Sequence, residues 1–77
     1  MERMNKVLQL EKSQFVGQEL FKLIQKLDNT VTNVMYQYIN GEEMVYVQYK
    51  DLSRKRVNVT ADSLGCLAIE VIKKVIY

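Results

Sequence analysis

The chain has no histidine, no proline and no tryptophan, and it has one cysteine among its 77 residues. A single thiol excludes a disulfide within the chain, and a zinc site needs clustered cysteine and histidine ligands that this sequence does not offer. Cys66 also lacks a histidine that would activate it as a nucleophile. We therefore expect no metal, no cofactor and no thiol chemistry, and we interpret Cys66 as a small packing residue inside a helix.

Long apolar runs are also missing. No uninterrupted apolar stretch exceeds four residues, whereas a helix that spans a membrane needs about 20 apolar residues and the apolar region of a signal peptide needs about 7–15. The sequence therefore predicts no membrane association and no export signal. Together with the single thiol, this pattern predicts a cytoplasmic protein.

Positive and negative charges are nearly balanced in this chain. Eleven basic and nine acidic residues leave a net charge of +2, which is weak for a dedicated nucleic-acid binder. The carboxylates are scattered along the chain, with no converging pair for acid–base catalysis, and the three glycines form no phosphate-binding loop. The sequence thus indicates no catalytic residues, and we predict that the protein is not an enzyme.

What the chain does contain is a globular composition, with 48% hydrophobic residues. Its length allows one domain, residues 1–77, near the lower limit for an independent hydrophobic core. Small domains usually gain stability from disulfides, a metal or a partner. Since the first two are excluded, we expect a dense core or self-association.

Two segments have the apolar period of an amphipathic helix. The first runs from about Ser13 to Leu27, with a stripe formed by Val16, Leu20, Leu23, Ile24 and Leu27. The second runs from about Ala61 to Ile76 and follows Thr60, whose hydroxyl can cap a helix. Its stripe comprises Leu64, Leu67, Ala68, Val71, Ile72 and Val75. The preceding segment Lys6–Leu10 fits either a short strand or an earlier helical turn, and we favour a short extended lead-in.

Three strands are predicted between these helices. Thr30 to Ile39, Met44 to Tyr49 and Arg54 to Val59 are rich in β-branched and aromatic residues. Asn40-Gly41 separates the first two strands and tolerates the positive φ values of a two-residue type I′ turn. Such a turn sets the cross-strand pairs, which are Tyr36 with Val45, Val34 with Val47, and Thr32 with Tyr49.

The order predicts an α+β fold: helix, three-stranded antiparallel meander, helix, or αβββα, with room for a short N-terminal strand. If both helices pack on the sheet face that carries Val34, Tyr36, Val45 and Val47, the other face is left without cover. That face carries Met35, Gln37, Ile39, Met44, Tyr46 and Gln48. We predict that Met35, Ile39, Met44 and Tyr46 form a protein interface. The alternatives are that the segment Met4–Leu10 folds over this face, or that one helix packs on each side.

The one basic run offers a second candidate surface. Arg54-Lys55-Arg56, with Lys50 nearby, can contact phosphates while a neighbouring tyrosine stacks on a base. The alternative interpretation is a solvated hairpin whose charges prevent the third strand from pairing with another chain. This second interpretation agrees better with so small a positive charge.

Two resemblances bear on function. The helix–three strands–helix order is similar to that of the double-stranded-RNA-binding domain, but this chain has Asp62 and no lysine where that family starts its last helix with a lysine cluster. The stretch Arg56-Val57-Asn58-Val59-Thr60-Ala61-Asp62-Ser63 resembles small uncharacterised phage and prophage proteins from Gram-positive bacteria. That resemblance covers about the last third of the chain. It implies a mobile-element setting, with the host cytoplasm as the location if the chain is encoded by a phage, and it assigns no site residue.

These observations together predict a small non-catalytic interaction protein. We expect a phage-type accessory or inhibitor that binds a host protein or associates with itself. The alternative is a nucleic-acid-binding module that uses Lys50, Arg54, Lys55 and Arg56.

Overall fold

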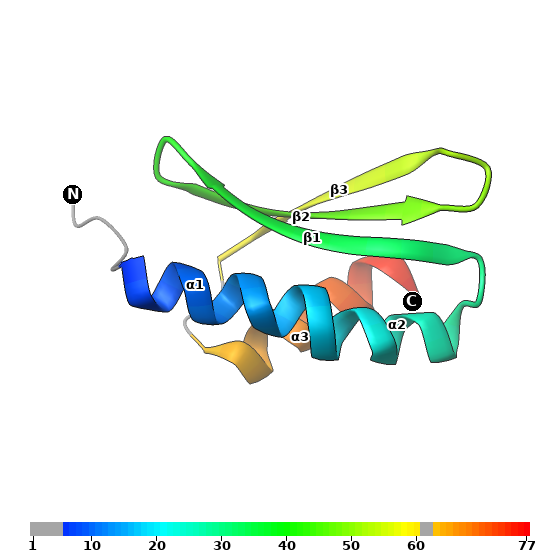
Figure 1. The fold of residues 1–77 in the computed structure, drawn as a ribbon, viewed down its shortest axis with the longest axis horizontal. Helices are drawn as coiled ribbons and strands as arrows, with labels where there is room; N and C mark the ends of the chain where they lie inside the picture. The colour runs from blue at the N-terminus through cyan, green and yellow to red at the C-terminus, as the bar shows by residue number, and fades with distance from the viewer. Residues whose placement is uncertain (1–5, 61–62) are drawn as a thin grey trace.

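The computed structural model describes residues 6–60 and 63–77 and has the predicted αβββα order (Figure 1). A long helical segment comes first, divided into α1 (Lys6–Phe15), η1 (Val16–Leu20) and α2 (Phe21–Leu27). The strands β1 (Val31–Ile39), β2 (Glu42–Tyr49) and β3 (Arg54–Val59) follow, and α3 (Leu64–Val75) comes last. The strands form one antiparallel sheet in the order β1-β2-β3, which confirms the α+β meander.

Both helical segments lie on the same side of the sheet (Figure 1). The first packs against β1 and α3 packs against β3, so the core is a single layer between the sheet and the helices. Its buried residues are Val16, Leu20, Ile24, Val31, Val34, Val45, Val47, Val57, Val59, Leu67 and Val71. The arrangement with one helix on each side of the sheet is therefore wrong.

The first helix begins earlier than the sequence predicted. Lys6–Leu10 form the first turns of α1, so the expected extended lead-in, and with it a strand in this segment, is wrong. These residues lie beneath the sheet as part of the helix and do not cover its other face; the rest of the segment Met4–Leu10 lies outside the described residues.

The buried stripe of this helix advances by four residues at each step. Lys12, Val16, Leu20 and Ile24 are all buried. In an α-helix, four residues turn about 40° more than one full revolution, so such a stripe drifts away from the sheet. The π-helical segment η1 places more residues in each turn and compensates for that drift. As a result, Leu23 and Leu27, which were predicted to be in the stripe, are 44% and 49% exposed.

The hairpin between β1 and β2 follows the prediction closely. Asn40 has φ 54° and Gly41 has φ 81°, as a type I′ turn requires. The pairs Tyr36 with Val45 and Val34 with Val47 are confirmed.

The third predicted pair of this hairpin, Thr32 with Tyr49, is wrong. The register shifts between Val31 and Asn33, and Val31 is opposite Tyr49 instead. This bulge turns Val31 into the core and leaves Thr32 exposed. The Thr32 hydroxyl donates to the Gln48 carbonyl oxygen at 3.3 Å. Burial of the valine in place of the threonine is the physical reason for the irregularity.

The last helix starts later than predicted. Ser63 is its N-cap, and the Ser63 hydroxyl accepts a hydrogen bond from the Cys66 amide at 3.3 Å, so the predicted Thr60 cap is wrong. The Thr60 amide instead donates to the Glu70 carboxylate, at 3.0 and 3.4 Å to its two oxygens. Cys66 is exposed in the first turn of α3, so its expected role as a packing residue is wrong too.

Candidate interaction face

Among the described residues, no helix lies over one of the two faces of the sheet (Figure 1). Because side chains alternate along each strand, the register places on this face Asn33, Met35, Gln37, Ile39, Glu42, Met44, Tyr46, Gln48, Arg54, Arg56 and Asn58. We call these residues the open face. Three rows cross it, formed by Asn33, Gln48 and Arg54, by Met35, Tyr46 and Arg56, and by Gln37, Met44 and Asn58.

The structure brings the predicted interface residues together on the open face. Met44 lies at its centre and is only 7% exposed, whereas Ile39, at the hairpin end, is 50% exposed. Met35 and Tyr46 are half-buried and adjacent across β1 and β2. The Tyr46 hydroxyl donates to the Met44 sulfur at 3.8 Å. Met35, Met44 and Tyr46 are neighbours along and across the strands and form an apolar patch, while Ile39 lies nearer the hairpin beside Gln37 and Glu42.

The basic run does not act as one cluster. Arg54 and Arg56 lie on the open face, and Lys50 lies in the turn between β2 and β3. Lys55 points to the helix side, where its ammonium donates to the Lys74 carbonyl oxygen at 2.6 Å, near the end of α3. The structure therefore separates Lys55 from the arginines, because adjacent residues of a strand face opposite sides.

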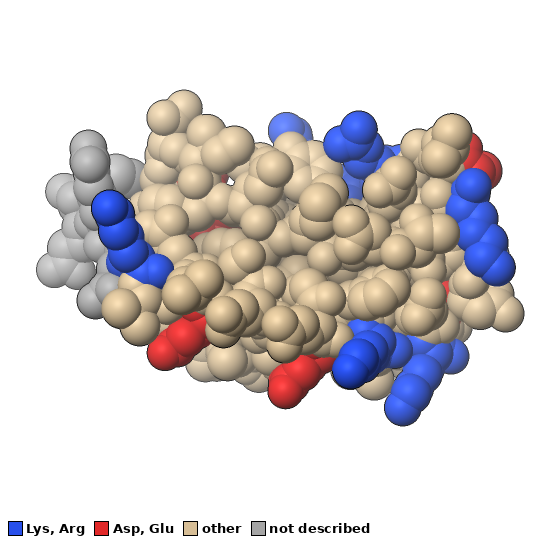
Figure 2. Space-filling view, viewed as in Figure 1, with Lys and Arg blue, Asp and Glu red and all other residues tan. Residues whose placement is uncertain are grey.

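Charge on the open face differs between its two ends. Glu42 is its only carboxylate and lies at the β1–β2 hairpin end, while both arginines lie on β3. Along the sheet side of Figure 2, the blue Lys and Arg atoms lie away from the tip of the β1–β2 hairpin. Within the described residues the single ion pair is Lys12 with Glu43, so Arg54 and Arg56 have no carboxylate partner.

Side chains from the helices form hydrogen bonds with backbone groups at both edges of the sheet. The Lys74 ammonium donates to the Asn58 carbonyl oxygen at 3.1 Å, and Glu70 accepts from the Thr60 amide. At the other edge, the Gln25 side-chain amide donates to the Val31 carbonyl oxygen at 3.1 Å. Such contacts hinder pairing of a further strand with these edges, and they leave the face as the larger available surface.

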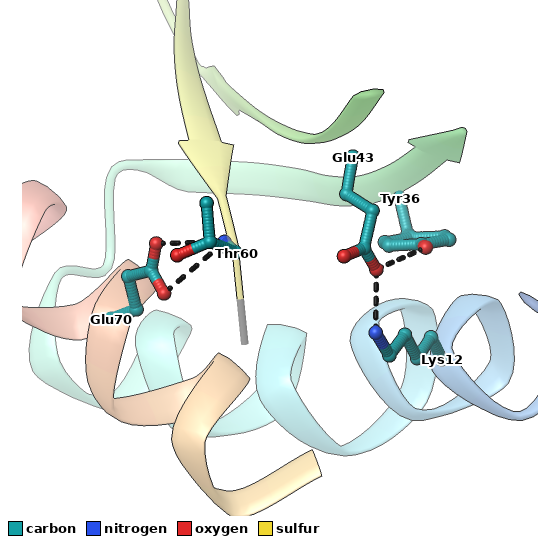
Figure 3. A network of polar contacts seen from close by, with 5 residues as sticks. All are labelled: Lys12, Tyr36, Glu43, Thr60 and Glu70. Carbon is teal, nitrogen blue, oxygen red and sulfur yellow. Dashed lines mark hydrogen bonds and ion pairs between the residues drawn. The ribbon is translucent and has the colours of Figure 1, made fainter. Parts of the chain in front are cut away.

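A buried polar cluster lies on the opposite, helix-covered side of the sheet (Figure 3). The Lys12 ammonium and the Tyr36 hydroxyl both donate to the same Glu43 oxygen, at 2.5 and 2.6 Å. Lys12 is 1% exposed. The pKa of Tyr36 is raised, mainly because the side chain is partly buried and secondly because its hydroxyl donates a hydrogen bond to Glu43. The cluster joins α1 to both strands of the hairpin, and removal of one of the paired charges would leave the other buried without a partner.

Sequence reasoning missed Lys12, although one signal was available. Lys12 is four residues before Val16, in the same stripe as Leu20 and Ile24. A lysine in an apolar stripe indicates a buried ion pair when a carboxylate can reach it. Its partner Glu43 is far away in the sequence and next to the exposed Glu42. The choice between these two glutamates depends on the strand register.

The described part of the chain shows no metal or membrane-spanning feature. No group of three His, Cys, Asp or Glu side chains gathers there in a way that could hold a metal ion. No helix within residues 6–60 and 63–77 is both long enough and apolar enough to cross a bilayer. Comparison of the chain with protein-family models, with curated proteins and with solved structures found no match.

Proposed function

We propose that this chain is a non-catalytic interaction protein that binds another polypeptide with its open face. One observation carries the proposal: an apolar patch of Met35, Met44 and Tyr46, with Ile39 nearer the hairpin, lies on a sheet face that neither helix covers. Exposed apolar patches within a polar rim are typical of protein-binding surfaces. Methionine side chains adapt their shape to a partner.

The polar residues around the patch favour a protein partner as well. Asn33, Gln37, Gln48 and Asn58 surround the apolar centre with amide groups, and Arg56 lies directly beside Tyr46. Tyrosine and arginine are enriched in protein interfaces, where a polar rim surrounds a desolvated centre.

Site-specific photocrosslinking tests the proposal in cells that express the chain. A photoreactive amino acid at Met35 should give crosslinked protein adducts, because this position belongs to the apolar patch of the proposed interface. The matched control is Leu23, which is also apolar and 44% exposed but lies on the helix side. Equal adducts from both positions, or none from Met35, would contradict the proposal. The masses of the adducts separate a second copy from a different protein.

A second candidate function is supported by Arg54 and Arg56. They share the open face with Tyr46 and have no carboxylate partner within the described residues, and a cationic strand beside an aromatic ring suits single-stranded nucleic acid. Replacing both arginines with serine should then weaken retention on nucleic acid and flatten its salt dependence. Lys55→Ser serves as the control, because Lys55 faces the helix side. Absence of any affinity in the unmodified chain at low salt would exclude this candidate.

We propose that this activity takes place in the cytoplasm, which agrees with the single unpaired thiol of the chain. A mobile-element setting follows from the resemblance of residues 56–63 to phage and prophage proteins. Both statements are independent of the interface proposal.

A further inference from the structure

The two ends of the open face carry opposite charges. Glu42 is at the β1–β2 hairpin end, opposite Ile39 in the neighbouring strand. Arg54 is at the other end, opposite Gln48, and Arg56 is one row nearer the centre. The apolar patch lies between these ends. A surface with this layout is complementary to itself when it is turned end for end.

We propose that the open face binds the open face of a second copy of this chain, with the strands of the two copies antiparallel. This inference rests on the proposed function and names its partner. A two-fold axis across the strands brings the Glu42 end of each copy over the Arg54 end of the other. Every contact in such a dimer occurs twice, so one favourable carboxylate–guanidinium pair becomes two.

The other two-fold arrangement is electrostatically worse. An axis along the strands leaves each residue of the central strand over its own equivalent in the second copy. Glu42 belongs to β2, the central strand, so the two Glu42 carboxylates would then face each other. Like charges in direct opposition destabilise a pairing, and the antiparallel arrangement avoids this contact.

A second copy fits the open face better than a partner with charge of one sign. An acidic partner would pair with Arg54 and Arg56 but would repel Glu42 at the other end of the patch. The second copy offers both signs in the matching places and covers the apolar centre with another apolar centre. Stacked sheets pack about 10 Å apart, and their strand axes are aligned to within about 30°, so the side chains of the two sheets can interdigitate.

The size of the open face indicates a weak dimer. Three strands about 4.8 Å apart, with about seven residues each, cover roughly 14 Å by 23 Å. That outline is roughly 320 Å², well below the about 800 Å² that a standard interface buries on each partner, so this face suits a weak, transient contact. We therefore expect dissociation in the micromolar range or above, and an association that salt weakens.

Sedimentation equilibrium of the purified, nuclease-treated full chain tests the inference. The variants are Glu42→Arg and the double variant Arg54→Glu with Arg56→Glu. In each variant alone, both charge contacts of the dimer become repulsive, and we expect its dissociation constant to rise at least about tenfold at low salt. A mixture of the two variants restores opposite charges at both contacts. The mixture should therefore associate to within about threefold of the unmodified chain.

Glu19→Arg is the matched control for net charge. Glu19 is exposed in η1, on the helix side, so its reversal should leave association unchanged. Circular dichroism verifies that each variant is folded. An unmodified chain that is monomeric at about 1 mM would overturn the inference, as would a mixture that associates no better than its components, or association only when nucleic acid is present. If Met35 still crosslinks to another protein in cells, the proposed function survives such a failure.

Discussion

Strand β2 shows how differently the two faces of the sheet are used. Val45 and Val47 point toward the helices and are fully buried, whereas Tyr46, between them in the sequence, is half-buried on the open face. Met44 is apolar and almost buried although its strand position turns it away from the helices of the described residues. Apolar character along a strand therefore does not identify the core. The position of the helices decides which of two apolar faces becomes the interior.

Charged residues show the same contrast. On the covered face, Lys12 and Glu43 are buried and paired, and Tyr36 shares the same carboxylate oxygen. On the open face, Arg54 and Arg56 are exposed and have no carboxylate partner within the described residues. Burial makes an unpaired charge costly, and solvent removes most of that cost. The covered face is thus constrained by the fold, while the open face is free to match a partner.

The strongest test of this contrast is one substitution made on both faces. Val45→Glu places an unpaired carboxylate in the core, and we expect loss of the folded state, because the cost rivals the total stability of about 5–15 kcal/mol for such a domain. Tyr46→Glu, at the next residue, should stay folded and lose about 1 kcal/mol. Circular dichroism and urea unfolding measure both outcomes. Equal effects at the two positions would remove the distinction between the faces.

The buried ion pair gives the next largest effect. Lys12→Met leaves Glu43 without its cation, and we expect a loss of about 3–5 kcal/mol in the free energy of unfolding. Adding Glu43→Gln removes the unpaired charge and should recover a large part of that loss. Lys22→Met is the control: Lys22 is exposed on α2 and should change stability by less than about 0.5 kcal/mol. Urea unfolding of the original chain, of Lys12→Met, of Glu43→Gln and of the double variant measures the coupling between the two residues, and additive losses would mean that the pair contributes nothing.

The turn that sets the register of both faces can be weakened on its own. Gly41 has φ 81°, and Gly41→Val should cost about 1–2 kcal/mol because a β-branched residue resists positive φ. Gly17→Ala is the contrasting change: an added Cβ there meets no atom within 4 Å, so we expect a gain of about 0.5–1 kcal/mol. Thermal unfolding measures both changes. A Gly41→Val protein as stable as the original would argue against the type I′ turn.

The smallest effect concerns alkaline pH. Burial and Glu43 raise the pKa of Tyr36 in the folded chain, while an unfolded tyrosine loses its proton near pH 10. Above that pH the unfolded state holds fewer protons than the folded state, so stability falls as the pH rises. Tyr36→Phe should make this fall shallower. Part of it should remain, because burial also raises the pKa of Tyr49.

The control for the alkaline experiment is Tyr46→Phe, which removes a hydroxyl from the open face. Urea unfolding between about pH 8 and pH 11 compares the three proteins. A slope that Tyr36→Phe leaves unchanged would show that the covered tyrosine does not titrate differently in the folded and unfolded states.

Local sequence signals predicted the strands well because each signal acts within a few neighbouring residues. The Asn40-Gly41 turn set two of the three hairpin pairs, and β3 has the predicted bounds from Arg54 to Val59. The failure at Thr32 came from a bulge that puts Val31 into the core. Strict alternation of side chains along a strand could not predict this bulge. The free energy gained by burying Val31 comes from contacts with elements that are far away in the sequence.

The helices show the same limit. A period of 3.6 residues predicted Leu23 and Leu27 in the stripe, but the π-helical turn at Val16–Leu20 shifts the phase and leaves both exposed. The late start of α3 at Leu64 has a local cause, since Ser63 offers the same kind of cap as Thr60. The sequence alone does not decide which of these two hydroxyls, three residues apart, caps the helix.

The sequence by itself determined the αβββα order and the division of apolar side chains between two sheet faces, because strand alternation and turn geometry are local properties of the backbone. Only the tertiary structure decided that both helices cover one face, that Lys12 pairs with Glu43, and that Lys55 separates from Arg54 and Arg56. These outcomes depend on contacts between residues far apart in the chain. Their free energies arise from burial and desolvation, which exist only once the elements have packed together.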